Sequence, residues 1–365
     1  MMEHSDNLFM KKKYSACIIG TGRIGFTLGF DKKREQPASH TMACLNNPKI
    51  RITGGCDSNA EALAEWKKYV DRHISQITFS EDKKVKTFSE KQIDLMFASC
   101  NPDIVIIAVN EDSHLETALK VIEKKPRLVI LEKPVALNLE EGKKIVKAAE
   151  KNKVPVLVNH ERRFASDYAM AKEYITKIGD VQKINACLFS GMRLYDPKAE
   201  KNGGYSLLHD GTHLVDIVMY LLEALGDSEL KKPVITGLFK DTKEKKVIRG
   251  FTANYSTKQV SDISIMMSGR SRYFGFEVDV IGTEGKICIG NGHAEFFKRQ
   301  KSNLYTGFYS LKEDKTVKLS KKTGYFANMI QNGVDFLDGK EPLRSTLETG
   351  MNALKVLEDI KAKIK

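Results

Sequence analysis

A glycine-rich turn near the start of the chain constrains its fold more than any other feature. A short apolar run, Tyr14 to Ile19, is followed directly by Gly20-Thr21-Gly22-Arg23-Ile24-Gly25, a G-x-G-x-x-G turn. In such a turn the first glycine allows a tight bend, the second lets a pyrophosphate approach the backbone, and the third lets a helix pack closely on the strand. The N-terminus of that helix offers N–H groups and a partial positive charge to the phosphates. The motif therefore predicts a dinucleotide-binding strand, turn and helix.

An acidic residue ends the next predicted strand, Ile50 to Cys56. Asp57 would accept hydrogen bonds from the adenosine ribose and repel a 2′-phosphate, which favours NAD over NADP. A plain turn or helix-capping role for Asp57 is the alternative. The spacing from Gly25 is 57 − 25 = 32 residues, whereas about 20 is usual. The excess fits an insertion, Phe30 to Ser39, after which the helix would resume at His40.

Strands and helices continue to alternate through the N-terminal half. The predicted strands are Asp103 to Val109, Leu128 to Leu131 and Val154 to Val158, and the predicted helices are Ala60 to Tyr69, Glu90 to Ser99, one beginning near His114 after a Ser113 cap, and Leu139 to Asn152. This alternation predicts a doubly wound α/β domain with a parallel sheet.

The strand from Leu128 to Leu131 stops at Glu132-Lys133-Pro134. Pro134 lacks a backbone donor and disfavours helix at the preceding residue, so the strand ends there. A lysine at the carboxyl end of a parallel strand lies where open α/β sheets bind ligands. Lys133 is therefore a candidate site residue, with a solvated lysine at a strand end as the alternative.

The pattern changes after Asn159. Period-two alternation dominates from Pro233 to Phe297, which predicts a meander of antiparallel strands. The other predicted elements are a strand, Val181 to Ser190, and the helices Phe164 to Ile178, Leu207 to Leu225, Tyr325 to Leu337 and Ser345 to Lys361. We therefore expect two domains: a Rossmann domain over residues 11–134, with its sheet extended by residues 135–158, and an α+β domain over residues 159–365. The large, mostly antiparallel sheet of the second domain could pair with a second subunit to form a homodimer or homotetramer.

Composition restricts the class of protein. The chain has 365 residues, too many for one hydrophobic core. Its formal net charge is +12, but the lysines are scattered and not interleaved with aromatic residues. A solvated basic surface is therefore favoured over nucleic-acid binding, and such a surface would speed the encounter with an anionic small substrate.

The six cysteines form no C-x-x-C pair, which fits a reducing cytoplasm and argues against structural zinc. No apolar run reaches the ~20 residues of a membrane span. We expect a cytoplasmic protein that interacts with neither membrane nor nucleic acid.

A polar cluster marks the helix that is expected to open at Leu207. His209 and His213 are four residues apart and share one helical face, and Asp216 follows about one turn later. A zinc site is an alternative, but the glutamate of H-E-x-x-H and a third ligand are missing. A structural role for both histidines is the other alternative.

Taken together, the motifs resemble those of the Gfo/Idh/MocA oxidoreductases, the family of glucose–fructose oxidoreductase and inositol dehydrogenase. The residues that carry the resemblance are Gly20 to Gly25, Glu132-Lys133-Pro134, Gly203-Gly204, Asp210-Gly211-Thr212-His213-Leu214-Val215-Asp216, Asn110 with His114, and Arg162-Arg163-Phe164. The resemblance covers nearly the whole chain from about Lys11.

The resemblance implies NAD(P)-dependent oxidation or reduction of a sugar, a polyol such as inositol, or a nucleotide sugar. It implies catalytic roles for Lys133 and His213. The family often has an aspartate four residues before that histidine, whereas this chain has His209, which would relay the proton or contact the substrate. The expected cofactor-binding residues are Gly20, Thr21, Gly22, Arg23, Ile24, Gly25, Asp57, Val109, Asn110, His114 and Glu132, and the expected substrate-binding residues are Arg163, Arg193, Tyr205 and Asp210. No metal is expected.

The predicted reaction moves a hydride from a substrate carbinol to nicotinamide, with His213 taking the hydroxyl proton and Lys133 stabilising the alkoxide. Either group could be the base. Two alternatives remain: an NAD-assisted lyase or glycosidase that regenerates its cofactor in each cycle, and a non-catalytic regulator that senses sugar and NAD.

Overall fold

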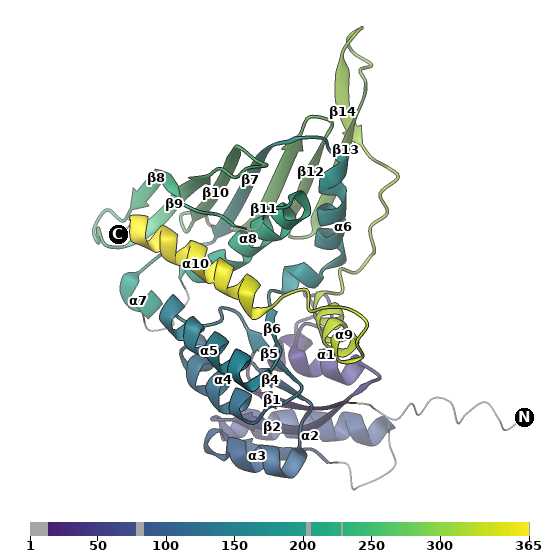
Figure 1. The fold of residues 1–365 in the computed structure, drawn as a ribbon, viewed down its shortest axis with the longest axis vertical. Coiled ribbons are helices and arrows are strands. Elements are labelled where there is room, and N and C mark those ends of the chain that lie inside the picture. Colours follow the sequence, from purple (N-terminus) through teal and green to yellow (C-terminus); the bar gives the residue numbers. More distant parts are fainter. Residues whose placement is uncertain (1–13, 78–83, 202–205, 228, 365) are drawn as a thin grey trace, which may run out of the picture. The chain divides into compact units, whose positions relative to one another are not determined.

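The computed structural model describes residues 14–77, 84–201, 206–227 and 229–364. The chain forms two compact units (Figure 1). The first comprises Met1–Ala136, Glu140–Phe164 and Gly324–Leu347, and the second comprises Leu137–Leu139, Ala165–Thr323 and Glu348–Lys365. The division differs from the one expected from the sequence, because residues 324–347 return to the first unit.

The first unit contains a six-stranded sheet in the order β3-β2-β1-β4-β5-β6, and every neighbouring pair is parallel. Its strands are β1 Tyr14–Ile19, β2 Ile50–Asp57, β3 Lys86–Ser89, β4 Ile104–Ile107, β5 Leu128–Glu132 and β6 Val156–Asn159. Its helices are α1 His40–Asn46, α2 Ala60–Ile77, α3 Ile93–Cys100, α4 His114–Glu123, α5 Leu139–Asn152 and α9 Tyr325–Leu337, with short 3₁₀ helices η2 Thr27–Phe30, η4 Glu90–Gln92, η5 Glu111–Ser113 and η6 Glu161–Phe164. The predicted doubly wound fold is confirmed.

Two adjacent glycines of β2 show how helices cover both faces of this sheet. A Cβ on Gly55 would lie 2.4 Å from the Trp66 ring of α2. A Cβ on Gly54 would lie 2.9 Å from Cys100 Sγ of α3 and 3.1 Å from Cys17 Sγ. Successive residues of a strand face opposite sides, so α2 and α3 pack against opposite faces.

Helix α9 belongs to the first unit because its apolar side shares that unit's core. Phe326, Met329, Ile330 and Val334 lie in the same buried cluster as side chains of β1, β2, β4 and β5. The sequence pattern predicted this helix with the right bounds, but the periodicity of its apolar residues does not say which sheet the helix covers.

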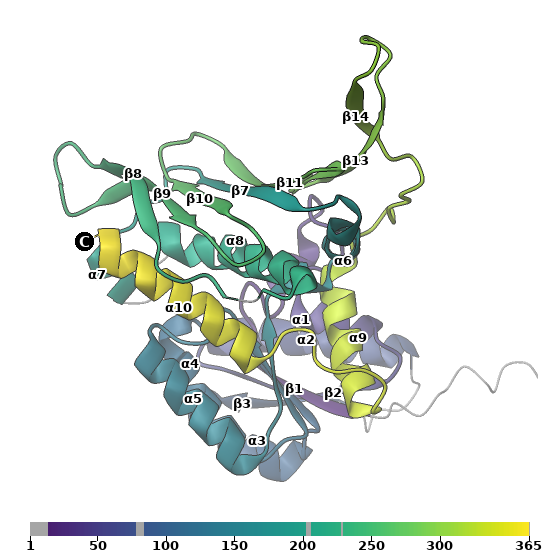
Figure 2. The same cartoon turned by 45° about the horizontal axis from the view of Figure 1, so that its top comes forward.

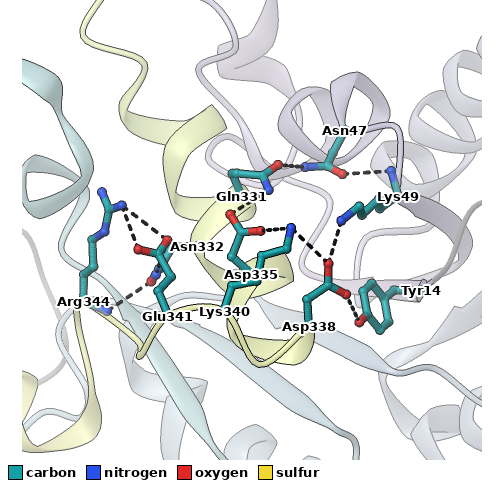
Figure 3. Close-up of polar contacts among 10 residues, drawn as sticks. All are labelled: Tyr14, Asn47, Lys49, Gln331, Asn332, Asp335, Asp338, Lys340, Glu341 and Arg344. Atoms are coloured by element: carbon teal, nitrogen blue, oxygen red, sulfur yellow. Dashed lines mark hydrogen bonds and ion pairs between the residues drawn. The ribbon is translucent and has the colours of Figure 1, made fainter.

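Polar contacts also fix the C-terminal half of α9 (Figure 3). Tyr14 donates its hydroxyl hydrogen to Asp338 Oδ1 at 2.6 Å, and Lys49 Nζ lies 2.6 Å from Asp338 Oδ2. Asn47 Nδ2 donates to Gln331 Oε1 at 3.0 Å. The end of α9 is therefore tied both to the start of β1 and to the loop before β2.

The second unit contains an eight-stranded sheet in the order β14-β13-β12-β11-β7-β10-β9-β8. Only β7 and β10 pair in parallel, so the sheet is mostly antiparallel, as predicted. The strands are β7 Val181–Ser190, β8 Val234–Lys240, β9 Ile248–Tyr255, β10 Asp262–Ser268, β11 Phe274–Gly282, β12 Gly285–Gly290, β13 His293–Lys301 and β14 Tyr309–Glu313. The helices are α6 Ser166–Tyr174, η7 Ile175–Lys177, α7 Pro197–Lys201, α8 Leu207–Leu222, η8 Glu223–Leu225 and α10 Leu347–Ile364.

Helices α6, α8 and α10 cover one face of the second sheet (Figure 2). The packing of α8 is close, since a Cβ on Gly211 would lie 2.4 Å from Met267 Sδ of β10 and 3.8 Å from Leu357 Cδ2 of α10. None of the helices in the described ranges is long and apolar enough to cross a membrane.

Candidate active site

The glycine turn lies at the carboxyl end of β1, and each glycine has a different environment. Gly20 has a φ of +94°, and a Cβ there would lie 2.4 Å from the Ala108 carbonyl oxygen. A Cβ on Gly25 would lie 2.0 Å from the Gly20 carbonyl oxygen. A Cβ on Gly22 would meet nothing within 4 Å. The first and third glycines are required by the fold itself, whereas the second leaves one side of the turn open to a ligand.

The helix that begins at these glycines is interrupted and resumes at His40, as the long interval before Asp57 predicted. Phe26 N–H donates to the Gly22 carbonyl, and Leu28 N–H donates to the Arg23 carbonyl five residues back. The chain then leaves the helix, and the carbonyls of Ile24 and Gly25 accept hydrogen bonds from the N–H groups of His40 and Thr41. Helix α1 therefore completes a helical turn that began at the glycines.

This geometry explains the unusual spacing before Asp57. In an uninterrupted α-helix the Ile24 carbonyl would accept from residue 28, and here it accepts from His40. The excursion thus adds 40 − 28 = 12 residues, and 32 − 12 = 20 is the usual interval between the glycines and the acidic residue.

The excursion, residues 28–39, is anchored on α9. Glu35 Oε1 accepts a hydrogen bond from Gly324 N–H at 2.6 Å, and the Tyr325 hydroxyl donates to the Glu35 carbonyl at 3.2 Å. Ser39 caps α1 by accepting from Met42 N–H at 3.4 Å. The insertion therefore packs within the first unit.

Asp57 lies at the end of β2, and its carboxylate braces the glycine turn. Thr21 donates to Asp57 Oδ2 from its backbone N–H at 2.6 Å and from its hydroxyl at 3.0 Å. Asp57 Oδ1 accepts from Asn59 N–H at 2.8 Å, and Asn59 itself caps α2 through Glu61 and Ala62 N–H. Capping of α2 is therefore done by Asn59, and Asp57 lies beside the open turn.

Glu132 ends β5 and is buried beneath the Glu132-Lys133-Pro134 turn. Its Oε1 lies 2.6 Å from both His40 Nε2 and Asn159 Nδ2. Burial by itself would raise the pKa of Glu132, but the hydrogen bond from His40, its charge, and the hydrogen bond from Asn159 outweigh this and lower the pKa. Glu132 is thus a buried carboxylate held by neighbouring side chains, and Lys133 beside it is partly exposed.

His114 joins the same turn to the end of β4. Its Nδ1 lies 2.7 Å from the Pro134 carbonyl oxygen, and its Nε2 lies 3.2 Å from the Val109 carbonyl oxygen. Burial lowers the pKa of His114 despite the opposing effect of the Pro134 carbonyl. A neutral imidazole has one N–H, so we assign the proton to Nδ1, whose contact is shorter. His114 therefore acts on this edge of the sheet by positioning Pro134. Ser113 precedes it without capping α4 through its side chain.

The second group of candidates lies on α8 in the second unit. Ser206 caps this helix by accepting from His209 N–H at 3.3 Å, and its hydroxyl donates to Glu200 Oε1 at 2.6 Å. His209 is buried, and His213, one turn later, is partly exposed. Both histidines therefore lie on α8, as predicted, and the Ser206 cap fixes the first turn of this helix.

Arg193 and Asp210, both predicted to contact substrate, form an ion pair in the second unit. Arg193 Nε lies 2.9 Å from Asp210 Oδ2. The backbone around Arg193 is fixed on both sides, because Met192 N–H donates to the Ser271 carbonyl and Leu207 N–H donates to the Leu194 carbonyl. The Asp210 carboxylate therefore points toward Arg193. This agrees with the expectation that Asp210 does not take the place of the aspartate that the family often has at the position of His209.

The remaining candidates differ in exposure. Arg163 in η6 is only 1% exposed, whereas Asn110 after β4 is exposed. Tyr205 and the Gly203-Gly204 pair lie outside the described residues.

Within the ranges that the structure describes, no group of three or more His, Cys, Asp or Glu side chains could hold a metal ion. Three polar residues near the glycine turn and the end of β5 were not among the predicted site residues: His40, Thr41 and Asn159. The sequence signal for the position of His40 and Thr41 was the predicted start of a helix at His40, directly after the insertion.

Comparison with known proteins identifies the family. Residues 15–160 match the oxidoreductase family model with an NAD-binding Rossmann fold, and residues 172–365 match the model of the C-terminal alpha/beta domain of the same family. The chain belongs to the Gfo/Idh/MocA oxidoreductase family. The resemblance seen in the sequence motifs is thereby confirmed.

Two relatives from Bacillus subtilis are named as inositol dehydrogenases. An NAD(+)-dependent scyllo-inositol 2-dehydrogenase is 28% identical over 77% of this chain and 75% of its own length. The NADP(+)-dependent scyllo-inositol 2-dehydrogenase IolW is 30% identical over 40% of this chain and 44% of its own length. The chain spans about half the length of the first curated relatives that it matches, at 40% and 51%.

Solved structures of dehydrogenases share the fold along nearly the whole chain. The WlbA dehydrogenase from Bordetella pertussis, in complex with NADH and UDP-GlcNAcA, superimposes with a TM-score of 0.65 at 16% identity, covering 96% of both chains. The carboxyl edge of the first sheet also fits a dinucleotide, because the side of Gly22 is open and Asp57 lies at the end of the neighbouring strand.

Proposed function

We propose that this protein is an NAD-dependent oxidoreductase that transfers a hydride between a secondary hydroxyl of a sugar-type substrate and nicotinamide. The observation that carries the proposal is the convergence of three features at the carboxyl ends of the strands of one parallel sheet: the open glycine turn after β1, Asp57 at the end of β2 and Lys133 after β5. Open α/β sheets bind ligands at this edge.

Cofactor binding in this proposal uses the residues of that edge. Gly22 gives the pyrophosphate access to the backbone of the turn, and Asp57 accepts hydrogen bonds from the adenosine ribose. The carboxylate would repel a 2′-phosphate, which supports NAD over NADP. Val109 and Asn110 follow β4 and would line the same side, while Glu132 and His114 act by holding the turn that carries Lys133.

The chemical step is assigned to Lys133 and His213. When bound, nicotinamide supplies the hydride acceptor. The ammonium group of Lys133 would donate a hydrogen bond to the substrate oxygen and stabilise the developing alkoxide. His213 would accept the hydroxyl proton, with His209 one turn earlier on α8 as the relay. Arg163, Arg193, Asp210 and Tyr205 remain the proposed substrate contacts.

A ring-shaped polyol or sugar is the proposed substrate. The names of several relatives share a dehydrogenase activity at carbon 2 or 3 of such a molecule: scyllo-inositol 2-dehydrogenase, glucose-6-phosphate 3-dehydrogenase and D-glucoside 3-dehydrogenase. The net charge of +12 favours an anionic member such as a nucleotide sugar. We also propose a cytoplasmic location and a homo-oligomer formed through the face of the second sheet that lies opposite α6, α8 and α10.

Absorbance of reduced nicotinamide tests the proposal. The protein is mixed with NAD, and separately with NADP, and with a panel of nucleotide sugars, free sugars and inositols. We expect a rise with NAD and one substrate class, and a loss of about a hundredfold or more in turnover for Lys133→Ala, with NAD binding kept. Lys143→Ala, which changes an exposed lysine of α5, is the matched control. Unchanged turnover in Lys133→Ala would refute the assignment, and product formation without net NADH would instead indicate a cofactor-recycling lyase or glycosidase.

A further inference from the structure

The hairpin of β13 and β14 carries exposed apolar side chains away from the core of the second unit. It extends beyond the other strands of its sheet (Figures 1 and 2). The tip, residues 302–308, contains no charged residue, and Leu304, Tyr305 and Phe308 are 81%, 65% and 67% exposed. Apolar surface gathered in this way marks an interaction site.

The tip has a defined conformation of its own. Ser302 N–H donates to the Phe308 carbonyl at 2.9 Å, and Ser302 Oγ accepts from the N–H groups of Leu304 and Tyr305 at 3.1 and 3.3 Å. The Tyr305 and Phe308 rings meet edge-on, with centroids 6.1 Å apart. The hairpin therefore fixes these apolar side chains in their exposed positions.

Strand β14 forms one edge of the eight-stranded sheet in the part of the chain that the structure describes. Two hydrogen bonds to β13 show which way its backbone faces: Ser302 N–H donates to the Phe308 carbonyl, and Asp314 N–H donates to the Phe296 carbonyl. In an antiparallel ladder every second residue bonds to the neighbouring strand, so the even-numbered residues of β14 face β13. The N–H groups that point to the open edge are those of Tyr309, Leu311 and Glu313.

The side chains of these same three residues share one face of the hairpin, because successive residues of a strand face opposite sides. Tyr309 and Leu311 are about half exposed. On β13, Lys301 lies opposite Tyr309 and Arg299 lies opposite Leu311, and the Arg299 guanidinium stands 4.3 Å from the centre of the Tyr309 ring. The open edge therefore presents two apolar side chains and one carboxylate, with two cations on the strand behind it.

An exposed edge strand is a template for another strand, and this edge is complementary to itself. In antiparallel pairing about a two-fold axis through Leu311, each outward N–H group meets a carbonyl of the other copy. Leu311 then lies opposite itself, and Tyr309 lies opposite Glu313 of the second copy. That carboxylate reaches the side of the hairpin where Arg299 and Lys301 lie, so the charges are complementary across the axis.

We propose that β14 pairs with β14 of a second copy of this chain, in the register that places Leu311 on the two-fold axis. The antiparallel direction carries each apolar tip past the end of the other β14, toward the segment that holds the exposed Leu319. This interface uses the edge of the second sheet, whereas the homo-oligomer proposed above uses its face. The inference does not depend on the proposed hydride transfer.

The test exploits the axis, where the residue at position 311 meets its own copy. Leu311→Lys and Leu311→Glu are each studied alone by sedimentation velocity over a range of concentrations, and are then mixed in equal amounts. Leu238→Lys is the matched control, because Leu238 is an exposed leucine of β8, the strand at the opposite edge of the sheet. Thermal melting of each variant reports on the fold, and neither NAD nor substrate is added.

We expect each charged variant to weaken self-association by about a hundredfold, because the leucine contact is lost and like charges lie directly opposite one another. The mass of the associated species should therefore fall by half. The mixture should associate to within about tenfold of the wild-type affinity, since a lysine then meets a glutamate. Leu238→Lys should keep the wild-type mass. If the face of the sheet also joins two copies, the fall is from four chains to two rather than from two to one.

A wild-type protein that sediments as a single chain would overturn the proposal, and so would an unchanged mass in both charged variants. A mixture that stays dissociated would show that position 311 is not on a two-fold axis, with the same consequence. Binding to phosphatidylglycerol vesicles that is lost in Leu304→Ser, while the mass of the protein does not change, would assign the tip to a membrane instead. Failure of the proposed dehydrogenase activity would leave all of these masses as they are.

Discussion

Thr21 donates two hydrogen bonds to one carboxylate oxygen of Asp57, from its backbone N–H at 2.6 Å and from its hydroxyl at 3.0 Å. The end of β2 therefore fixes the glycine turn after β1 and at the same time places a negative charge beside it. A similar pair of hydrogen bonds to one carboxylate oxygen lies at the other end of β1. There, Ser15 donates its backbone N–H and its hydroxyl to Asp103 Oδ2, both at 2.9 Å.

Asp57→Asn should weaken NAD binding and reduce the discrimination against NADP. The variant loses the charge that repels a 2′-phosphate and weakens the hydrogen bonds to the ribose, so we expect about a tenfold loss of NAD affinity. Titration calorimetry with both dinucleotides measures it. Asp103→Asn is the matched control, because it removes the same charge from the same type of contact at the opposite edge of the sheet. An equal NAD loss in both variants would contradict a ribose-binding role.

Gly22→Ala and Gly25→Ala should separate cofactor binding from folding. A methyl group on Gly22 meets no protein atom, so thermal stability should stay near the wild-type value while NAD affinity falls. A methyl group on Gly25 would lie 2.0 Å from the Gly20 carbonyl oxygen, so Gly25→Ala should destabilise the first unit. Thermal melting with and without NAD distinguishes the two. Normal NAD affinity in Gly22→Ala would place the pyrophosphate elsewhere.

Asp338→Ala should loosen α9. The carboxylate accepts from Tyr14 and pairs with Lys49 (Figure 3), and its side chain is only 7% exposed. Removing it leaves both partners without this acceptor, at a cost of about 2–4 kcal/mol. Glu116→Ala, which removes an exposed pair with Lys120 on α4, should cost less than about 1 kcal/mol. Urea unfolding and hydrogen exchange across α9 measure both, and similar losses would contradict the ranking.

Cys100 should be the cysteine that is alkylated most readily near neutral pH. Its hydrogen bond with Cys17 lowers the pKa of Cys100 to about 7, against the effect of burial and with help from Lys86. Burial raises the pKa of Cys56 to about 12. The thiolate is the reactive form, so iodoacetamide labelling of Cys100 should rise as the pH increases through 7, while Cys56 stays unlabelled. Peptide mass spectrometry reads both sites, and Lys86→Gln should shift the Cys100 profile to higher pH.

The fold was predictable from local signals that agree with one another. The β-branched run before Asn110, the stop at Pro134 and the alternation along β9 to β11 each determine an element and its burial, and together they specify a parallel and an antiparallel sheet. Helix α5 and strand β7 have the predicted bounds. These features depend on neighbours in sequence, which is why the sequence reveals them.

The site was predictable only where a motif names its residues. Lys133 and Asp57 were predicted from their places at strand ends, and their roles stay predictions. His40 was not predicted, because its contact with Glu132, 92 residues later, depends on an excursion that brings it beside the glycine turn. The same limit applies to α9. Its period and length were evident, but its place in the first unit follows from Phe326 and Asp338 meeting residues near the start of the chain.

The return of residues 324–347 to the first unit has a consequence for synthesis in the cell. The chain is made from its N-terminus, so the whole of the eight-stranded sheet emerges before α9 does. Until then, the apolar side of the first sheet and α1 that α9 will cover remains exposed. The first unit is therefore the first to begin folding, but it cannot complete its core until α9 has been synthesised. A nascent chain stalled before residue 324 would present the uncovered apolar surface to chaperones.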